Sequence, residues 1–318
     1  MKFISNRKKI FKRLAWSLVV VFILMNIVAY FHAYKFTHFA DPAIKKTADA
    51  KKLSTAAKIK TLLLGVNNPR PENIRQPERI FQTIKLQSNK EIECWYINAD
   101  TSIGTVIIFH GYSGEKSSML DKAEEFIRMG YNTLLVDFMG SGGSEGRQTT
   151  IGYKEAEEVK TCFDYLVSTG EKRIFLFGTS MGAAAVLKSI NDYSLTPSGI
   201  IIECPFGSLY ETTALRFRSM NAPAFPMAGL LVFWGGVQNG FWGFSYKPTE
   251  YAKMVTIPTL LMYGEKDEKV SRRETDKIYN NLSGPKKLVT FSKAGHENYL
   301  IDHKEDWVKE VRDFLISY

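Results

Sequence analysis

From about residue 80 onward, short apolar runs alternate with stretches of helical spacing. Arg79–Leu86 and Glu91–Asn98 alternate apolar and polar positions around a Ser-Asn-Lys turn, which is typical of a β-hairpin. Six short apolar runs follow and predict buried strands, at 105–110, 131–138, 173–178, 199–204, 256–264 and 286–292. The spacing between the runs predicts helices over 116–129, 152–168, 181–192, 271–282 and 298–317. This alternation predicts an α/β fold whose mostly parallel central sheet has helices on both faces.

A different pattern occupies the beginning of the chain. Residues 14–34 form an apolar run of 21 positions without Asp, Glu, Lys or Arg, about the length that crosses a bilayer core. Six basic residues and no acid precede it, namely Lys2, Arg7, Lys8, Lys9, Lys12 and Arg13. The pattern predicts an N-terminal transmembrane helix at 14–34 after a basic tail over 1–13. A cleaved signal peptide is the alternative, but its apolar region is usually about 7–15 residues, and Phe31-His32-Ala33 matches a cleavage site poorly.

The flanks of this run bear on topology. Six basic residues within the first 13 positions are denser than the five within 18 positions after the run, which are Lys35, Lys45, Lys46, Lys51 and Lys52. The positive-inside rule therefore favours a cytoplasmic N-terminus and a main domain on the non-cytoplasmic face. Segment 35–79 is Lys- and Ala-rich and then Pro-rich, so we expect a stalk, partly helical and then extended, before a main domain over 80–318.

Charge and cysteine content exclude several classes of function. The 318 residues carry a net charge of +9, but residues 1–60 hold 13 basic and two acidic residues, so the remaining chain has a balance of −2. We therefore expect no nucleic-acid partner, because the basicity belongs to the tail and stalk. Cys94, Cys162 and Cys204 are too widely spaced for a disulfide framework or a metal motif, so we expect neither a metal nor a cofactor.

The strand at 173–178 is followed by Gly178-Thr179-Ser180-Met181-Gly182 and then by a helical pattern. G-x-S-x-G between a strand and a helix is the setting of a nucleophile elbow, a tight turn that exposes a strained serine. The two glycines are needed because side chains there would collide with neighbouring backbone. An ordinary Gly-rich turn is the alternative, and the strand–turn–helix context argues against it.

A serine nucleophile needs a base and a carboxylate that orients the base. Only His296 and His303 follow Ser180, and His296 comes directly after the last predicted strand, whereas His303 lies within a helical pattern. Asp267 follows the strand at 256–264, with Glu265 and Glu268 as neighbouring candidates. Order and position predict a catalytic Ser180–Asp267–His296 triad. The backbone N–H groups of Met181 and of Tyr112, in the loop after the strand at 105–110, are the candidate oxyanion hole.

Six segments in order carry a family resemblance: HGYSG, DFMGSGGSEG, GTSMG, ECPFGSL, GEKDEKV and AGHEN. Residues 80–318 resemble the α/β-hydrolase superfamily, in its branch of serine-aminopeptidase-like and monoglyceride-lipase-like hydrolases. The resemblance implies the α/β-hydrolase fold and the same roles for Ser180, Asp267 and His296. Glu203 is similar to a strand-end Glu that holds nearby loops in this branch, and Met139 stands where the branch usually has Arg.

Residues 219–246 contain no charged side chain and many aromatic ones, and lie where this superfamily inserts a cap, here at about 205–250. The segment is expected to be a small cap on the core, a cap that lines an apolar acyl pocket, or a lid that dips into the membrane. A second span is disfavoured because prolines and glycines interrupt it. Candidate substrate-pocket residues are Gly111, Phe206, Phe225, Trp234 and Trp242.

The sequence therefore predicts a membrane-anchored serine hydrolase that cleaves carboxylic esters with an apolar part through an acyl-enzyme. A serine peptidase of short peptides is one alternative, although the cap lacks the acids that would bind an amine. A catalytically silent, membrane-tethered interaction module is another. The expected partners are a small-molecule ester and the membrane, and the sequence leaves the oligomeric state open.

Overall fold

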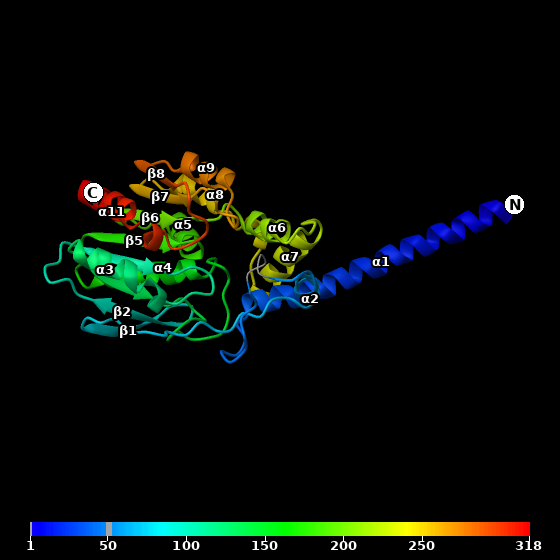
Figure 1. Ribbon diagram of the computed structural model, residues 1–318, viewed down its shortest axis with the longest axis horizontal. Helices are drawn as coiled ribbons and strands as arrows, with labels where there is room; N and C mark the ends of the chain where they lie inside the picture. Colours follow the sequence, from blue (N-terminus) through cyan, green and yellow to red (C-terminus); the bar gives the residue numbers. More distant parts are fainter. Residues whose placement is uncertain (1, 49–52) are drawn as a thin grey trace.

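The computed structural model describes residues 2–48 and 53–318, with the side chains of residues 2–7 left out. Residue 1 of the basic tail and residues 49–52 of the expected stalk, which include Lys51 and Lys52, lie outside this description. The main body is an eight-stranded sheet in the order β1-β2-β4-β3-β5-β6-β7-β8 (Figure 1). The strands are β1 (Phe81–Gln87), β2 (Glu91–Ile97), β3 (Thr105–Phe109), β4 (Asn132–Val136), β5 (Ile174–Thr179), β6 (Gly199–Glu203), β7 (Thr259–Gly264) and β8 (Lys286–Phe291).

Strand direction follows the hydrophobic pattern. β1 and β2 form the antiparallel hairpin, β2 also runs antiparallel to β4, and all remaining pairs are parallel. The inner strands β3, β4, β5, β6 and β7 are apolar along their length because helices cover both of their faces. The predicted α/β fold with a mostly parallel sheet is confirmed.

The main-domain helices fall where the spacing predicts them, within a few residues. They are α3 (Leu120–Arg128), α4 (Glu155–Ser168), α5 (Met181–Tyr193), α9 (Arg272–Asn281), α10 (Tyr299–Asp302) and α11 (Lys304–Ser317), with the short turn η2 (Lys116–Met119) before α3. One core cluster joins α4, α5 and α9 to one face of the sheet, and a second joins α3 and α11 to the other face. The single helix expected over 298–317 is broken at His303, which caps the end of α10 and the start of α11.

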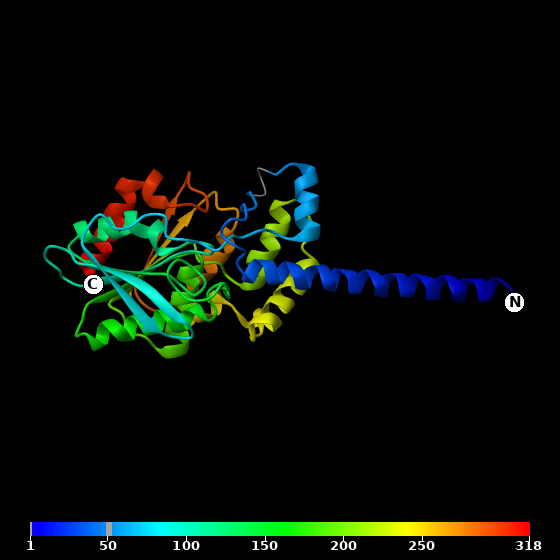
Figure 2. The ribbon, with the colours of Figure 1, turned by 90° about the horizontal axis from the view of Figure 1, so that it is seen from below.

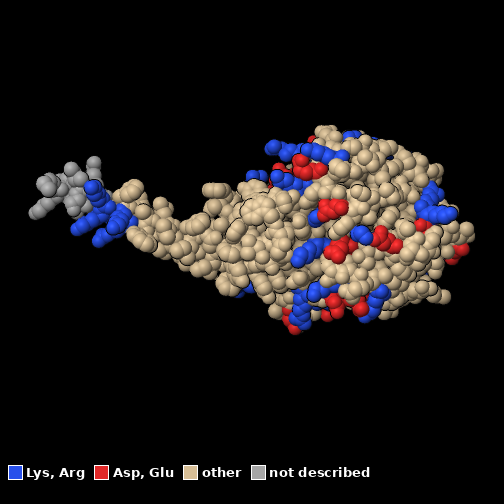
Figure 3. Space-filling model, turned by 180° about the vertical axis from the view of Figure 1, so that it is seen from behind, with Lys and Arg blue, Asp and Glu red and all other residues tan. Residues whose placement is uncertain are grey.

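Helix α1 (Lys2–Thr37) projects far from the main domain, with the N-terminus at its free end (Figures 1 and 2). Residues Lys8–Thr37 are long and apolar enough to span a membrane, and this is the one such helix in the described part of the chain. Figure 3 shows basic side chains at its tip, then a neck without charge, and both signs over the main domain. At 1.5 Å per residue, 30 residues extend about 45 Å, so the helix is longer than a bilayer core of about 30 Å.

The C-terminal end of α1 packs against the insertion between β6 and β7. This insertion contains α6 (Leu209–Ser219) and α7 (Met227–Asn239), followed by η3 (Gly243–Ser245), α8 (Pro248–Tyr251) and η4 (Ala252–Met254). We call α6 and α7 the cap. Ala29 and Ala33 of α1 are buried, the Trp234 indole donates to Asn26 Oδ1 at 3.1 Å, and Gln238 Nε2 donates to the Tyr30 carbonyl at 2.9 Å. The cap and the end of α1 therefore form one packed unit.

The segment between α1 and β1, expected to be a stalk, contains α2 (Thr55–Leu64) and lies against other parts of the chain. Lys35 Nζ donates to the Leu64 carbonyl at 2.8 Å. Arg70 donates to the Ser144 carbonyl at 2.7 Å, and Asn73 Nδ2 donates to Asp137 Oδ2 at 2.8 Å. The first bond ties the segment to α1, and the other two tie it to the loop after β4, at the carboxyl edge of the sheet.

Candidate active site

Ser180 occupies a strained turn between β5 and α5. Its φ of 52° and ψ of −106° lie in a region that a residue with a side chain rarely adopts. A Cβ on Gly178 would lie 2.7 Å from the Ala183 nitrogen, and one on Gly182 would lie 2.5 Å from the Phe109 carbonyl oxygen. The tight turn therefore needs glycine at both positions, and it places the serine hydroxyl at the positive N-terminal end of α5.

The structure brings the three predicted triad residues together. Ser180 Oγ lies 3.0 Å from His296 Nε2, and His296 Nδ1 lies 2.7 Å from Asp267 Oδ2. The other oxygen of Asp267 accepts hydrogen bonds from the backbone N–H groups of Lys269 at 2.7 Å and Val270 at 2.9 Å. An ionised Asp267 held in this way keeps the proton of His296 on Nδ1, so Nε2 is free to accept the serine proton.

The environment of His296 also sets its basicity. Burial lowers the pKa of this imidazole, but Cys204 and Asp267 outweigh burial and raise the pKa above the ordinary 6.5. Cys204, Asp267 and His296 are the group in the described part of the chain whose metal-ligating atoms come within 4.8 Å of one another. Because two of the three already hydrogen-bond to each other, this donor set fits an oriented base better than a metal centre.

Both candidate oxyanion residues line the same narrow slot as Ser180. Tyr112, Met181 and His296 line the slot, which measures about 10 Å³, room for roughly one water molecule. Within the described residues, no acceptor receives a hydrogen bond from the backbone N–H of Tyr112 or Met181. Two N–H groups beside a serine can stabilise an oxyanion that forms on its substrate.

The end of α1 holds Tyr112, a connection that the sequence did not reveal. The Tyr112 hydroxyl donates to the Phe36 carbonyl at 2.6 Å and accepts from Asn68 Nδ2 at 2.8 Å. The Tyr112 and Phe36 rings stack with centroids 4.7 Å apart. Burial raises the pKa of this phenol, so it stays protonated and able to donate.

Charged residues buried in the main domain hold the neighbouring loops. Lys116 pairs with both Asp137 and Glu93, and burial of Asp137 is outweighed by Lys116 and His110, which hold its pKa below the ordinary value. Met139, which stands in the position of the family's Arg, is buried, and Lys116 supplies the counter-charge to Asp137 instead. His110 fixes the start of the loop that carries Tyr112, because its Nε2 accepts a hydrogen bond from the Phe138 N–H at 3.1 Å.

Glu203, which lies next to Ser180, accepts hydrogen bonds from several elements and acts as a buried hub. Its carboxylate accepts from Lys122 Nζ at 2.9 Å, from the Trp307 indole at 2.7 Å and from Thr179 Oγ1 at 3.0 Å, and its carbonyl accepts from the Ser180 N–H at 2.8 Å. The structure thus places Glu203 where the resemblance implies a loop-holding Glu.

The candidate pocket residues divide into two groups. Phe206 lines the slot, and a Cβ on Gly111 would lie 3.7 Å from Ser180 Cβ. Phe225, Trp234 and Trp242 do not line the slot. Phe225 and Trp242 are 82% and 56% exposed, and Trp234 packs edge-on against Tyr30. Trp234 lies on α7 and faces α1, whereas Phe225 and Trp242 lie before and after α7 and are exposed at the surface.

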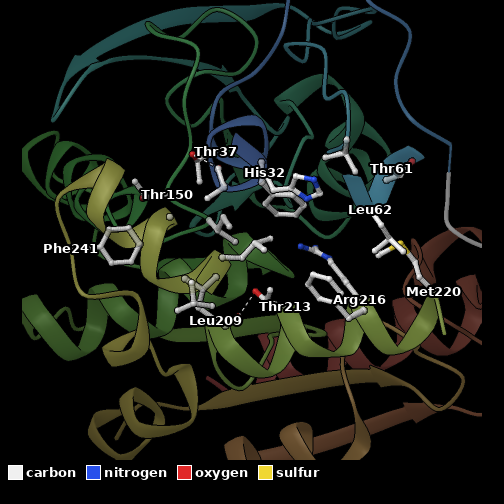
Figure 4. Close-up of a pocket in the computed structure, with 18 residues that line it drawn as sticks. His32, Thr37, Thr61, Leu62, Thr150, Leu209, Thr213, Arg216, Met220 and Phe241 are labelled. Carbon is white, nitrogen blue, oxygen red and sulfur yellow. Dashed lines mark hydrogen bonds between the residues drawn. The ribbon is translucent and has the colours of Figure 1, made fainter. Parts of the chain in front are cut away.

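A second cavity of about 120 Å³ adjoins the slot and lies between the end of α1, α2 and the cap (Figure 4). Ile151 and Arg216 line both the slot and this cavity. Arg216 could not be identified from the sequence, because its position at the cavity depends on how α6 is placed relative to the end of α1.

The chain is similar in sequence to several known proteins. The model of a family described as serine aminopeptidase, S33, matches residues 100–239. The uncharacterized protein YqkD of Bacillus subtilis is 23% identical over 77% of this chain and 81% of its own length. The acylamino-acid-releasing enzyme of Rattus norvegicus is 23% identical over 75% of this chain, which spans 34% of that enzyme.

Solved structures share the fold. The esterase Pf2001 of Pyrococcus furiosus superimposes with a TM-score of 0.67 at 23% identity and covers 79% of this chain and 97% of its own. Est1E of Butyrivibrio proteoclasticus, solved with ferulic acid, gives a TM-score of 0.58 at 17% identity over 74% of this chain and 98% of its own.

Proposed function

We propose that the chain is a membrane-anchored serine hydrolase of the α/β-hydrolase superfamily and that it cleaves carboxylic esters with an apolar part. The match of residues 100–239 to the serine aminopeptidase family and the fold shared with solved esterases support this proposal. The proposed catalysis rests mainly on one observation. Ser180, in a strained turn, hydrogen-bonds to His296 at 3.0 Å, and His296 hydrogen-bonds to Asp267 at 2.7 Å. Esterases among the structural relatives support ester chemistry.

The proposed reaction has two halves. Ser180 Oγ attacks the ester carbonyl carbon while His296 Nε2 takes its proton, and the N–H groups of Met181 and Tyr112 stabilise the oxyanion. The tetrahedral intermediate expels the alcohol, which receives that proton from His296, and leaves an acyl-enzyme. Water then repeats the sequence with His296 as base and releases the acid and the free serine. Asp267 orients His296 and stabilises its protonated form.

Labelling with a fluorophosphonate tests the nucleophile. We expect the wild-type protein to be labelled and Ser180→Ala to give no signal. Ser168→Ala, which removes an exposed serine at the end of α4, is the matched control and should be labelled like the wild type. Equal labelling of wild type and Ser180→Ala would refute the assignment of Ser180.

Peptidase activity is the second candidate, and the relationship to acylamino-acid-releasing enzymes favours it. Among the described residues, however, the slot is lined by the cations Arg216 and Lys269 and by no carboxylate, so a free N-terminal amine would meet like charge there. We therefore expect hydrolysis of p-nitrophenyl esters and little hydrolysis of aminoacyl p-nitroanilides. A higher kcat/KM on the anilides would reverse the order of the two candidates. Absence of turnover on both, with no labelling, would favour a silent interaction module.

The proposed anchor is α1, with the N-terminus in the cytoplasm and the main domain on the non-cytoplasmic face. The length and apolar character of Lys8–Thr37 support a membrane span, and the basic residues before position 14 are the argument for a cytoplasmic N-terminus. A C-terminal tag on the full chain in sealed cells should be open to externally added protease. Protection of the tag would contradict the orientation, and a mature N-terminus beyond residue 34 would contradict the anchor.

A further inference from the structure

The cavity beside the slot has the character of a chain-binding site. Its walls are mostly apolar, and they come from α1, α2 and the cap; the lining includes Ala33, Phe36, Leu62, Phe217, Leu231 and Val232. The cavity lies next to the slot. Among the described residues, Ile151 and Arg216 are the two side chains that line both. A chain that starts at Ser180 and passes these two side chains enters the cavity. The slot alone, at about 10 Å³, holds no acyl chain.

Ile151 is held in place against its own backbone preference. Its φ is +60°, which is strained for a β-branched residue. The buried Glu155 carboxylate fixes the turn, since it accepts from the N–H groups of Thr150 and Gly152, both at 2.9 Å. Backbone strain that a buried hydrogen-bond network maintains is typical of functional positions. The side chain of Ile151 lies at the entrance to the cavity.

Arg216 brings a positive charge to the same entrance. Its guanidinium lies 4.6 Å from the Phe36 ring centroid and 5.7 Å from that of Tyr112. Within residues 2–48 and 53–318 it has no ion pair and its side chain makes no hydrogen bond. Figure 4 shows it reaching from α6 into the cavity toward α1. A cation among apolar walls is unfavourable unless an anion accompanies it, and an anionic ligand would supply that partner.

We propose that this cavity binds the acyl chain of a single-chain lipid ester, and that Arg216 binds a phosphate or carboxylate on the alcohol part of the same molecule. The inference rests on the proposed function, because the ester must lie at Ser180. The end of the membrane helix forms one wall, through Ala33 and Phe36. A lipid beside α1 would therefore lie next to the cavity, and the face of the helix drawn in Figure 3 carries no charge between the basic tip and the main domain.

The chain site is tested with two glycines of α7. A Cβ on Gly235 would meet only Ala33 Cβ, at 4.0 Å, so Gly235→Leu projects into the cavity. A Cβ on Gly229 would meet nothing within 4 Å, and Gly229 does not line the cavity, so Gly229→Leu is the matched control with the same gain in helix propensity. The readout is the ratio of kcat/KM for p-nitrophenyl octanoate to that for p-nitrophenyl acetate, in full-length protein.

We expect the ratio to fall at least tenfold in Gly235→Leu and to stay within about twofold in Gly229→Leu, since each buried methylene contributes substantially to binding. An unchanged ratio in Gly235→Leu would overturn the chain site. Fluorophosphonate labelling of each variant separates the two hypotheses. A labelled Gly235→Leu with an unchanged ratio refutes the cavity alone, whereas an unlabelled wild type refutes the proposed function.

The charge site is tested with three octanoyl esters used as monomers: octanoylglycerol, octanoylglycerol 3-phosphate and octanoylglycerate. We expect the wild type to prefer at least one anionic ester by about tenfold in kcat/KM, and the preferred ester identifies phosphate or carboxylate. Arg216→Gln should remove this preference, mainly through KM. Arg218→Gln, which removes an exposed arginine of the same helix, should keep it. No preference in the wild type, or a preference that survives Arg216→Gln, would overturn the proposal.

Discussion

Glu203→Gln tests whether the buried hub beneath Ser180 is held by charge. The Glu203 side chain is fully buried and that of Lys122 is 3% exposed, with Nζ 2.9 Å from Oε2. The substitution keeps the size of the side chain but removes the negative charge and replaces one acceptor with a donor. Because both carboxylate oxygens receive hydrogen bonds, the new amide group must face a donor from Lys122, Trp307 or Thr179.

The magnitude follows from burial. Breaking a buried ion pair by removing one partner costs about 3–5 kcal/mol, because the other charge stays buried without a counter-ion. For a domain of this size, each kcal/mol lowers Tm by about 2–4 °C, so Glu203→Gln should lower Tm by roughly 6–20 °C. The assay is thermal unfolding of the full-length protein in detergent, followed by tryptophan fluorescence.

Two further variants decide the cause. Lys85 and Glu91 form an exposed pair at 2.8 Å, so Glu91→Gln should leave Tm close to that of the wild type. The double variant Lys122→Met/Glu203→Leu removes both charges and should be more stable than Glu203→Gln. A Glu203→Gln protein that unfolds within 1 °C of the wild type would refute the reasoning, as would a double variant less stable than the single one.

Three other outcomes are expected. Gly182→Ala places a Cβ 2.5 Å from a backbone oxygen and should lower kcat/KM at least about 100-fold, whereas Gly229→Ala should match the wild type; equal activities would contradict the elbow argument. Tyr112→Phe leaves the Phe36 carbonyl of α1 without its donor, so denaturant titration should show a loss of roughly 1–3 kcal/mol in the free energy of unfolding. In steady-state kinetics the same variant should lower kcat more than it changes KM. The base works only as neutral imidazole, so a raised pKa of His296 places the rise of kcat/KM with pH above 6.5, and Asp267→Asn should move it to lower pH; a wild-type rise at or below 6.5 would count against this.

The positions of the proposed triad could be predicted from the sequence because strand ends are local features. Ser180, Asp267 and His296 each follow an apolar run, and the carboxyl ends of parallel strands meet at one edge of a sheet. Residues 116 positions apart along the chain therefore lie within 3.0 Å of each other. Local periodicity also predicted the hairpin and the helices, because each depends on which face is buried.

The cap residues could not be placed in the same way. The sequence shows that α7 is apolar on most sides, but it does not show which side faces Ser180. The bonds of Trp234 to Asn26 and of Gln238 to Tyr30 each span 208 positions, and they turn Trp234 toward α1.

The sequence by itself determined the fold class, the order of the triad, the strained serine turn and an N-terminal helix able to span a membrane. It did so because hydrophobic period, glycine placement and charge are properties of neighbouring residues. Only the tertiary structure decided that the end of this helix holds Tyr112 and walls the cavity, and that Arg216 faces it. Those contacts arise where helices distant in sequence pack together, and their orientation is set by side-chain fit rather than by any local pattern.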